Sequence, residues 1–266
     1  MSEPAPAPSS AATTPVVNVD LLPARADLEG ASPYTDVVIV VDVLRTTTTV
    51  PVLFDQGLAA VRLSPSLRVA RRAAAARGDL LVGERRGVPP EGFNYGNSPV
   101  TLAQCDLSGH DAIMVSENAP EALTYLSDAR AVALGSMVNL DAVCDWAIAK
   151  VRTRVDLVCC GFSGEPDLDD LVTAGLLADG MMRRHAALRP TGATRLALSA
   201  VQSYADPLTA LWASRAAAYL RGLGLERDIG FAADLDRSRT VPRMDDPERV
   251  HGGVLYPFRP ASCHGG

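Results

Sequence analysis

The chain has 266 residues, of which 47% are hydrophobic and 21% are charged, so it can bury a substantial core in one large domain or two small ones. Its formal net charge of −6 at pH 7 argues against a nucleic-acid-binding surface, which needs a basic stripe. No run approaches the roughly 18 apolar residues of a membrane span, and the five cysteines form neither a C-x-x-C pair nor a zinc-ligand spacing. We therefore expect a cytoplasmic protein with reduced thiols and without nucleic-acid or membrane partners.

The first fifteen residues, MSEPAPAPSSAATTP, differ in composition from the rest of the chain. They are rich in Pro, Ala and Ser and contain neither the basic nor the apolar segment of a signal peptide. This composition predicts a disordered tail over residues 1–15. A single domain over residues 16–266 is expected to follow, because no linker or internal repeat interrupts the remaining sequence.

The first predicted elements alternate between strand and helix. Residues 37–42, VVIVVD, are almost all β-branched, which is typical of a strand buried on both faces. A helix should follow and end near Gly57, and Pro51 fits it only if the helix starts around Thr47 or Thr48. Residues 60–64 form the next expected strand. The helix after it should have Ser66 as N-cap and Gly78 as its C-terminal stop.

The same alternation continues through the rest of the chain. Further strands are expected over residues 79–83, 112–116, 131–135 and 155–160, and helices over residues 139–151, 168–188 and 196–220, the last with a break at Pro207. The C-terminal segments DIGFAADLD (228–236) and GGVLYPF (252–258) are expected to add edge strands. Such βα alternation predicts an α/β protein with a three-layer α/β/α architecture and a mostly parallel, mixed central sheet.

Polar side chains follow four of the expected strands. In open parallel sheets, ligands bind beyond the carboxyl ends of the strands. The residues that follow these ends are Asp42, Arg45 and Thr46 to Thr49; Glu84, Arg85 and Arg86; Glu117 and Asn118; and Gly161, Ser163, Gly164 and Glu165. Polar loops at strand ends are common, but acids paired with arginines at two of them are not explained by solvation alone.

Two carboxylates, several arginines and helix N-termini are the groups that hold a divalent cation and a charged oxyanion. Mg²⁺ takes one or two carboxylates and shares phosphate oxygens, while arginine and helix amides bind the anion. Phosphoryl transfer is the chemistry that suits this set. The chain has no P-loop motif, no cysteine-phosphatase arginine and, with Leu44 two residues after Asp42, no haloacid-dehalogenase-type aspartate pair.

A series of motifs in a fixed order resembles the 2-phosphosulfolactate phosphatase family. They are DVLRTTTT, GERRG, GFNYGNSP, GSMVNL and CCGFSGEPDLDD, and the likeness runs from about Val37 to Pro242. The resemblance implies a three-layer α/β fold and Mg²⁺-dependent hydrolysis of a small anionic phosphoester, 2-phosphosulfolactate, to sulfolactate and phosphate. It leaves open whether the protein forms a homodimer.

The resemblance also implies roles for individual residues. Asp42, Arg45 and Glu84 are the expected catalytic residues. The expected substrate-binding residues are Thr47, Arg85, Asn97, Ser98, Asn118, Gly161 and Gly164. The expected Mg²⁺ ligands are Asp42, Glu84, Asp170 and Asp236.

Three loops depart from the family pattern. Residues 115–120, VSENAP, stand where the family reads T-T-T-N-G-T, so that Asn118 keeps its family identity and Glu117 is introduced. Arg86 replaces a glycine and is a candidate partner for Glu117, and Phe162 replaces a threonine. These changes leave the identity of the substrate open, and they also keep open an alternative function, an anion-binding protein that has lost turnover.

Overall fold

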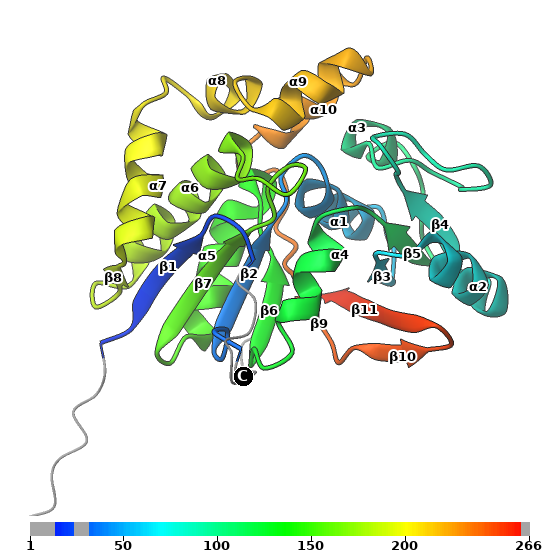
Figure 1. The fold of residues 1–266 in the computed structure, drawn as a ribbon, viewed down its shortest axis with the longest axis horizontal. Coiled ribbons are helices and arrows are strands. Elements are labelled where there is room, and N and C mark those ends of the chain that lie inside the picture. The colour runs from blue at the N-terminus through cyan, green and yellow to red at the C-terminus, as the bar shows by residue number, and fades with distance from the viewer. Residues whose placement is uncertain (1–13, 24–31, 262–266) are drawn as a thin grey trace, which may run out of the picture.

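The computed structural model describes residues 14–23 and 32–261, and it is built on one eleven-stranded sheet (Figure 1). The strand order is β4-β5-β3-β11-β9-β6-β2-β7-β1-β8, with β10 paired to β11. The strands are β1 (Val16–Asp20), β2 (Val37–Val41), β3 (Ala60–Ser64), β4 (Leu80–Gly83), β5 (Asp111–Val115), β6 (Ala131–Leu134), β7 (Arg154–Cys159), β8 (Arg189–Pro190), β9 (Pro242–Met244), β10 (Glu248–Val250) and β11 (Gly253–Pro260). The predicted disordered tail lies outside the described residues, except for Thr14 and Pro15.

Two blocks of parallel strands make up most of the sheet. Strands β6, β2, β7, β1 and β8 form one block, and β4, β5 and β3 form the other. Between the blocks, β11 pairs antiparallel with β3 and with β9, and β9 pairs antiparallel with β6. The sheet is therefore mixed and mostly parallel, as predicted.

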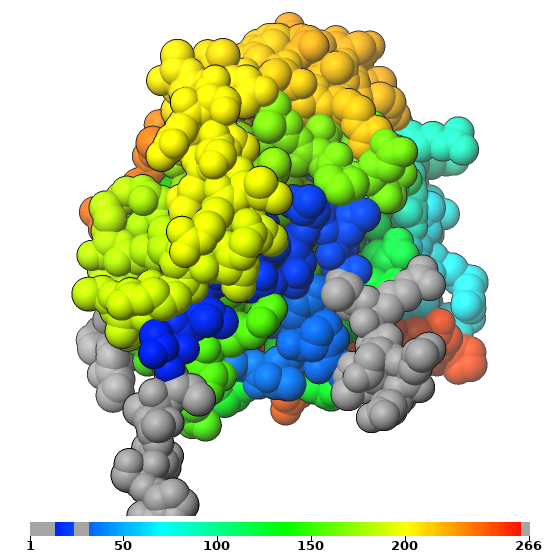
Figure 2. Space-filling model, turned by 60° about the vertical axis from the view of Figure 1, so that its left-hand side comes forward, coloured from blue at the N-terminus to red at the C-terminus, as the bar shows by residue number. Residues whose placement is uncertain are grey.

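Helices cover both faces of the sheet, which confirms the three-layer architecture. They are α1 (Thr46–Asp55), α2 (Leu67–Arg77), α3 (Pro99–Leu102), α4 (Ala119–Ala122), α5 (Leu140–Lys150), α6 (Leu168–Arg184), α7 (Gly192–Gln202), α8 (Pro207–Trp212), α9 (Arg215–Gly222) and α10 (Glu226–Ala232), with 3-10 turns η1 (Leu123–Tyr125) and η2 (Met137–Asn139). Figure 2 shows α7, in yellow, beside the blue N-terminal part of the chain, with the orange helices above it. None of the described helices combines the length and hydropathy needed to cross a bilayer.

Strand β2 explains why the sheet needs cover on both sides. All five of its residues are buried, and alternate side chains enter different cores. Val37, Ile39 and Val41 pack in the core that includes α5 and α6, whereas Val38 and Val40 pack in the core that includes α1 and α4. A continuous β-branched run is what a strand buried on both faces requires.

The helix signals read from the sequence are mostly confirmed. The hydroxyl of Ser66 accepts the Val69 amide at 3.3 Å, and Gly78 ends α2 in the left-handed conformation with φ 77°. Pro207 starts α8, as the predicted break required. Helix α1 begins at Thr46, one residue earlier than expected, so Pro51 lies inside the helix and removes one intrahelical hydrogen bond.

The two C-terminal strand predictions are wrong in different ways. The segment 228–236 contributes to helix α10 and is not a strand, because Ile229 and Ala232 are three residues apart and enter the same core. The segment 252–258 does form a strand, β11, but it lies inside the sheet between β3 and β9 and not at an edge. Strands β1, β8, β9 and β10 were not predicted.

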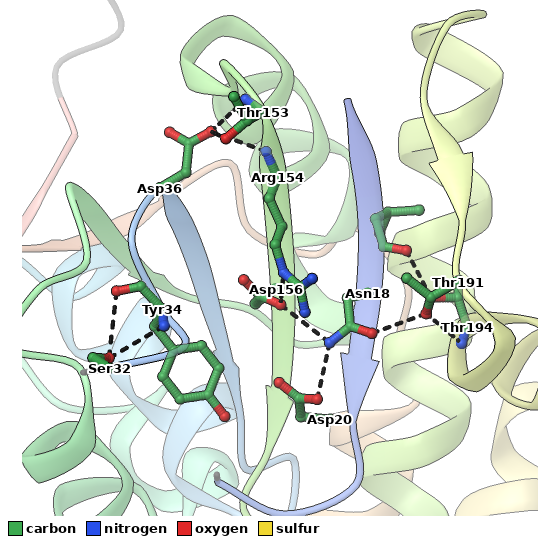
Figure 3. Close-up of polar contacts among 11 residues, drawn as sticks. Asn18, Asp20, Ser32, Tyr34, Asp36, Thr153, Arg154, Asp156, Thr191 and Thr194 are labelled. Carbon is green, nitrogen blue, oxygen red and sulfur yellow. Dashed lines mark hydrogen bonds and ion pairs between the residues drawn. The ribbon is translucent and has the colours of Figure 1, made fainter. Parts of the chain in front are cut away.

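A buried carboxylate joins the start of β2 to the start of β7 (Figure 3). Asp36 accepts the backbone amides of Arg152, Thr153 and Arg154 at 2.8, 2.7 and 3.0 Å, and Arg130 donates to its other oxygen. This one side chain therefore fixes how two neighbouring parallel strands begin.

Candidate active site

A small pocket of about 50 Å³ lies where the loops after β2, β4 and β5 meet helix α9. Five of the predicted site residues line it: Asp42, Arg45, Glu84, Asn97 and Asn118. The other lining residues are Leu44, Thr46, Gly87, Ser116, Glu117, Phe162, Ala216, Tyr219 and Leu220. A larger cavity of about 440 Å³ lies against β6, β9 and β10 and contains none of the predicted site residues.

Asp42 directly follows β2 and is 5% exposed. One of its carboxylate oxygens accepts the amide of Ala119, the first residue of α4, at 3.0 Å. Burial raises the pKa of the Asp42 carboxyl, and hydrogen bonds from Thr46 and Ala119 oppose that rise. The loops after β2 and β5 are thereby joined at the pocket by the side chain that we expect to be catalytic.

The four threonines are buried at the start of α1 and mostly build the turn. The hydroxyl of Thr47 accepts the Asp42 amide at 3.1 Å, and that of Thr48 donates to the Val43 carbonyl at 2.8 Å. Thr46 is the member of the cluster that lines the pocket. The predicted substrate-binding residue Thr47 therefore supports the loop that carries Asp42.

Glu84 reaches the pocket from the end of β4. The preceding Gly83 has φ 129°, and a Cβ there would lie 2.0 Å from the Val115 carbonyl oxygen, so only glycine fits. The Glu84 carboxylate accepts the Gly87 amide at 2.7 Å. Burial, followed by the charges of Glu117 and Asp42, raises the pKa of Glu84 and outweighs the Gly87 amide.

Arg45 is 5% exposed and is held by two contacts. One terminal nitrogen donates to Asp228 of α10 at 2.9 Å, and the other donates to the Gly87 carbonyl at 2.7 Å. Ser98, a predicted substrate-binding residue, donates to the second oxygen of Asp228 at 2.6 Å. Sequence reasoning missed Asp228, because the segment that contains it was interpreted as an edge strand.

Two buried polar atoms of the pocket have no hydrogen-bond partner among the described residues. They are the side-chain oxygen of Asn97, which is 3% exposed, and the hydroxyl of Ser116, which is 2% exposed. Buried polar atoms are nearly always paired, so these two indicate a place for a ligand group. Ser116 was not predicted, although it retains a hydroxyl at the second position of the altered loop.

An aromatic pair forms one wall of the pocket. The rings of Phe162 and Tyr219 are 5.6 Å apart, and the Tyr219 hydroxyl donates to the Arg86 carbonyl at 2.9 Å. The partner of Glu117 is Arg85, at 3.7 Å, and not Arg86, so that expectation is corrected. Arg86 adopts φ 54°, in the tight turn that its backbone shares with Gly87.

Four predicted residues support the loops near the pocket without lining it. The two oxygens of Asp170 accept the amides of Val43, at 2.9 Å, and of Cys160 and Gly161, at 3.1 and 2.8 Å. Burial and the charge of Asp42 raise the pKa of Asp170 to about 8. Gly161 has φ 69°, and a Cβ there would lie 2.3 Å from the Glu165 carbonyl oxygen. The other two residues are Thr47 and Ser98, described above.

The remaining predicted residues lie farther out. Asp236 accepts the Asp141 amide at 2.6 Å at the start of α5, away from the pocket. Gly164 lines a neighbouring cavity that shares Asn118 with the pocket. Arg85 donates to the Pro65 carbonyl beside its pairing with Glu117. The pocket thus brings together the expected catalytic residues Asp42, Arg45 and Glu84, but not Asp170 or Asp236.

Sequence comparisons identify the family to which this chain belongs. The family described as 2-phosphosulpholactate phosphatase matches residues 24–247 of this chain. A protein of Deinococcus radiodurans named "Probable 2-phosphosulfolactate phosphatase" is 36% identical over 87% of this chain and 97% of its own length. A protein of the same name from Thermus thermophilus is 36% identical over 79% of this chain and 88% of its own. The chain belongs to the 2-phosphosulfolactate phosphatase family and is a phosphoric monoester hydrolase.

Proposed function

We propose that this protein is a Mg²⁺-dependent phosphatase that hydrolyses 2-phosphosulfolactate to sulfolactate and inorganic phosphate. The observation that supports the proposal most is the meeting of Asp42, Arg45 and Glu84 in one buried pocket. The proposed substrate is the one in the names of the two relatives. The proposed location is the cytoplasm, in keeping with the free thiols of Cys105, Cys144, Cys159 and Cys160.

The oxygen atoms of the pocket fit Mg²⁺. The described residues contain no cluster of three His, Cys, Asp or Glu side chains that could hold a metal by themselves. Mg²⁺ does not need one, because it binds through one or two carboxylates and keeps waters and substrate phosphate oxygens. Asp42 and Glu84 would supply the carboxylates, and the unpaired amide oxygen of Asn97 would be a third oxygen.

Charge also favours a cation in the pocket. Three carboxylates line it, those of Asp42, Glu84 and Glu117, whereas Arg45 is the one guanidinium among the described lining residues. A phosphate ester entering this pocket would meet more negative than positive charge. When bound, Mg²⁺ supplies neutralisation of charge on the phosphoryl oxygens.

The side chains around the pocket have separate roles in the proposed reaction. Arg45 uses the N–H groups not engaged by Asp228 and Gly87 to stabilise the phosphoryl group as its charge shifts. Ser116 donates its unpaired hydroxyl to a phosphoryl oxygen. Water attacks phosphorus, and the bond to the ester oxygen breaks with its electron pair on that oxygen. Asp42 or Glu84, both in the lining of the pocket, takes a proton from the water and passes it to the leaving oxygen.

Phosphate release from 2-phosphosulfolactate tests this proposal, with Mg²⁺ present and after its removal by a chelator. Asp42→Asn and Glu84→Gln should each lower kcat by about 100-fold or more, because each removes a charged group from the transition-state environment. The exposed residues Asp106 and Glu91 provide matched controls, Asp106→Asn and Glu91→Gln, with unchanged turnover. Phosphate binding without turnover by the wild type would instead support the anion-binding alternative.

A further inference from the structure

A continuous series of contacts connects three separate loops behind the pocket. Ser98 donates to Asp228 at 2.6 Å, Arg45 donates to Asp228 at 2.9 Å and to the Gly87 carbonyl at 2.7 Å, and the Gly87 amide donates to Glu84 at 2.7 Å. The series starts at the N-cap of α3, passes through α10 and ends at the carboxylate after β4.

Asp228 is the buried centre of this series. Its side chain is 2% exposed and that of Arg45 is 4% exposed, so the ion pair is almost completely removed from water. Removing two charges from water costs about as much as their attraction returns, and a buried pair is therefore weak support for a stabilising role. Such a pair can instead fix the orientation of its two side chains, because a charged hydrogen bond sets the direction of both partners.

These contacts use some of the N–H donors of Arg45 and leave the others. A guanidinium has five N–H groups. One N–H of one terminal nitrogen is directed at Asp228, and one of the other terminal nitrogen is directed at Gly87. Both anchors act on the terminal nitrogens, so the plane of the guanidinium cannot rotate while they are intact. The other three N–H groups take no part in these two contacts, and Arg45 is among the residues that line the pocket.

We infer that Asp228 is a positioning residue of the active site, which acts through Arg45 by fixing the orientation of its guanidinium toward the phosphoryl group of the substrate. This inference rests on the role proposed above for Arg45. Asp228 itself does not line the pocket. Its effect on the reaction should therefore disappear once the Arg45 guanidinium is absent.

A double-mutant cycle in kcat/KM tests this coupling. Asp228→Asn keeps the size of the side chain and removes its charge, and it should lower kcat/KM by about 10–100-fold, mostly through kcat, because misplacement of a catalytic group has effects of that order. Arg45→Ala should cost about 100–1,000-fold. The double variant should be no worse than Arg45→Ala by more than about twofold, since the two changes remove the same interaction.

The control is Asp36→Asn, which removes another buried, arginine-paired carboxylate far from the pocket. Its effect on kcat/KM should be small. In a double variant with Arg45→Ala, the fold-losses of the two single variants should multiply. Ser98→Ala should give a smaller loss than Asp228→Asn, again only when Arg45 is present. Calorimetric binding of inorganic phosphate, run on the same four proteins of the cycle, should show the same non-additivity.

Three results would overturn the inference, and they are distinguishable. If the double variant loses the product of the two single losses, Asp228 acts independently of Arg45, and the positioning role is wrong while the proposed function stands. If Arg45→Ala retains wild-type kcat/KM, the role proposed for Arg45 itself is wrong. A fall in melting temperature of Asp228→Asn without a fall in kcat/KM would reduce Asp228 to a structural residue.

Discussion

At the scale of single residues, the predicted catalytic side chains are held by partners that could not be seen near them in the sequence. Arg45 follows Asp42 by three positions and was expected to face an anion. In the structure its guanidinium is already anchored by Asp228, which is 183 positions away. By contrast, the amide oxygen of Asn97 and the hydroxyl of Ser116 are buried and have no hydrogen-bond partner among the described residues.

Replacing Arg45 with lysine should weaken anion binding although the charge is conserved. A lysine has a single ammonium group and cannot contact Asp228 and Gly87 while presenting a planar pair of donors to phosphate. We expect the affinity for inorganic phosphate in the presence of Mg²⁺ to fall about tenfold, or about 1.4 kcal/mol. Calorimetry on Arg45→Lys measures this, with Arg72→Lys, on the exposed face of α2, as the control. Equal affinities in the wild type and Arg45→Lys would show that Arg45 does not bind the anion.

At the scale of elements, buried carboxylates hold strand ends and loops together by accepting backbone amides. Asp170 connects the loop after β2 to the loop after β7, and Asp36 connects the segments that precede the same two strands. Backbone amides in loops have no ladder partner, so a carboxylate that accepts two or three of them replaces the missing bonds. Asp170 fixes two loops beside the pocket in this way, whereas Asp36 fixes the opposite ends of the same strands.

Asp36→Asn should destabilise the protein at neutral pH and not at strongly acidic pH. Burial by itself raises the pKa of Asp36, but the amides of Thr153 and Arg154 and the Arg130 side chain outweigh it and hold the pKa well below the usual 3.8. The folded state therefore gains stability above about pH 4 and loses it as the pH falls below that value. Denaturant unfolding at pH 7 should show a loss of about 2 kcal/mol in the variant.

The pH dependence of stability that Asp156 contributes should have the opposite sign to that of Asp36, and Asp156→Asn should remove it. Asp156 lies on β7 beside Asn18 and Arg154 (Figure 3), and burial raises its pKa to about 6 although Arg154 opposes the rise. Between about pH 4 and 6 the folded state keeps a proton that the unfolded chain releases, so wild-type stability falls as the pH rises through that range. The variant should lack this fall and be at least as stable as the wild type at pH 7. If Asp156→Asn is less stable than the wild type at pH 7, the raised pKa of Asp156 is contradicted.

At the scale of the whole molecule, the pocket lies between parts of the sheet that run in different directions. Asp42 belongs to one parallel block, and Glu84 and Ser116 follow strands of the other. The blocks are separated by β9 and β11, which reverse the direction of pairing. Neighbouring strands are rotated by about 20–25°, and this twist accumulates across the sheet, so the loops of both blocks converge at one place. Helix α9 then closes the pocket, and α10 holds Arg45 through Asp228.

A ligand that contacts both blocks should stabilise the whole protein. Mg²⁺ and inorganic phosphate together should raise the melting temperature more than either alone, because each binds the folded pocket and neutralises charge that opposes the other. In a chain of this size each kcal/mol of binding stabilisation corresponds to about 2–4 °C. Thermal unfolding with and without a chelator measures the shift. Asp42→Asn should lose the part of the melting-temperature shift that depends on Mg²⁺. An unchanged shift in that variant would place the ion elsewhere.

Local patterns determined much of this protein. The β-branched run of β2 gave a strand buried on both faces, Ser66 and Gly78 bounded α2, and Pro207 began α8, because each depends on neighbouring residues and on backbone geometry. The motifs at strand ends likewise identified Asp42, Arg45 and Glu84, since such residues follow their strands directly.

Only the tertiary structure decided how those pieces meet. Whether residues 228–236 form a strand or a helix depended on which core received Ile229 and Ala232, and the partner of Arg45 followed from that choice. The position of β11 inside the sheet depended on pairing with β3 and β9, contacts that no local pattern specifies. Long-range pairing and burial are properties of the complete fold, so the sequence motifs named the expected catalytic side chains while the fold determined what holds them in place.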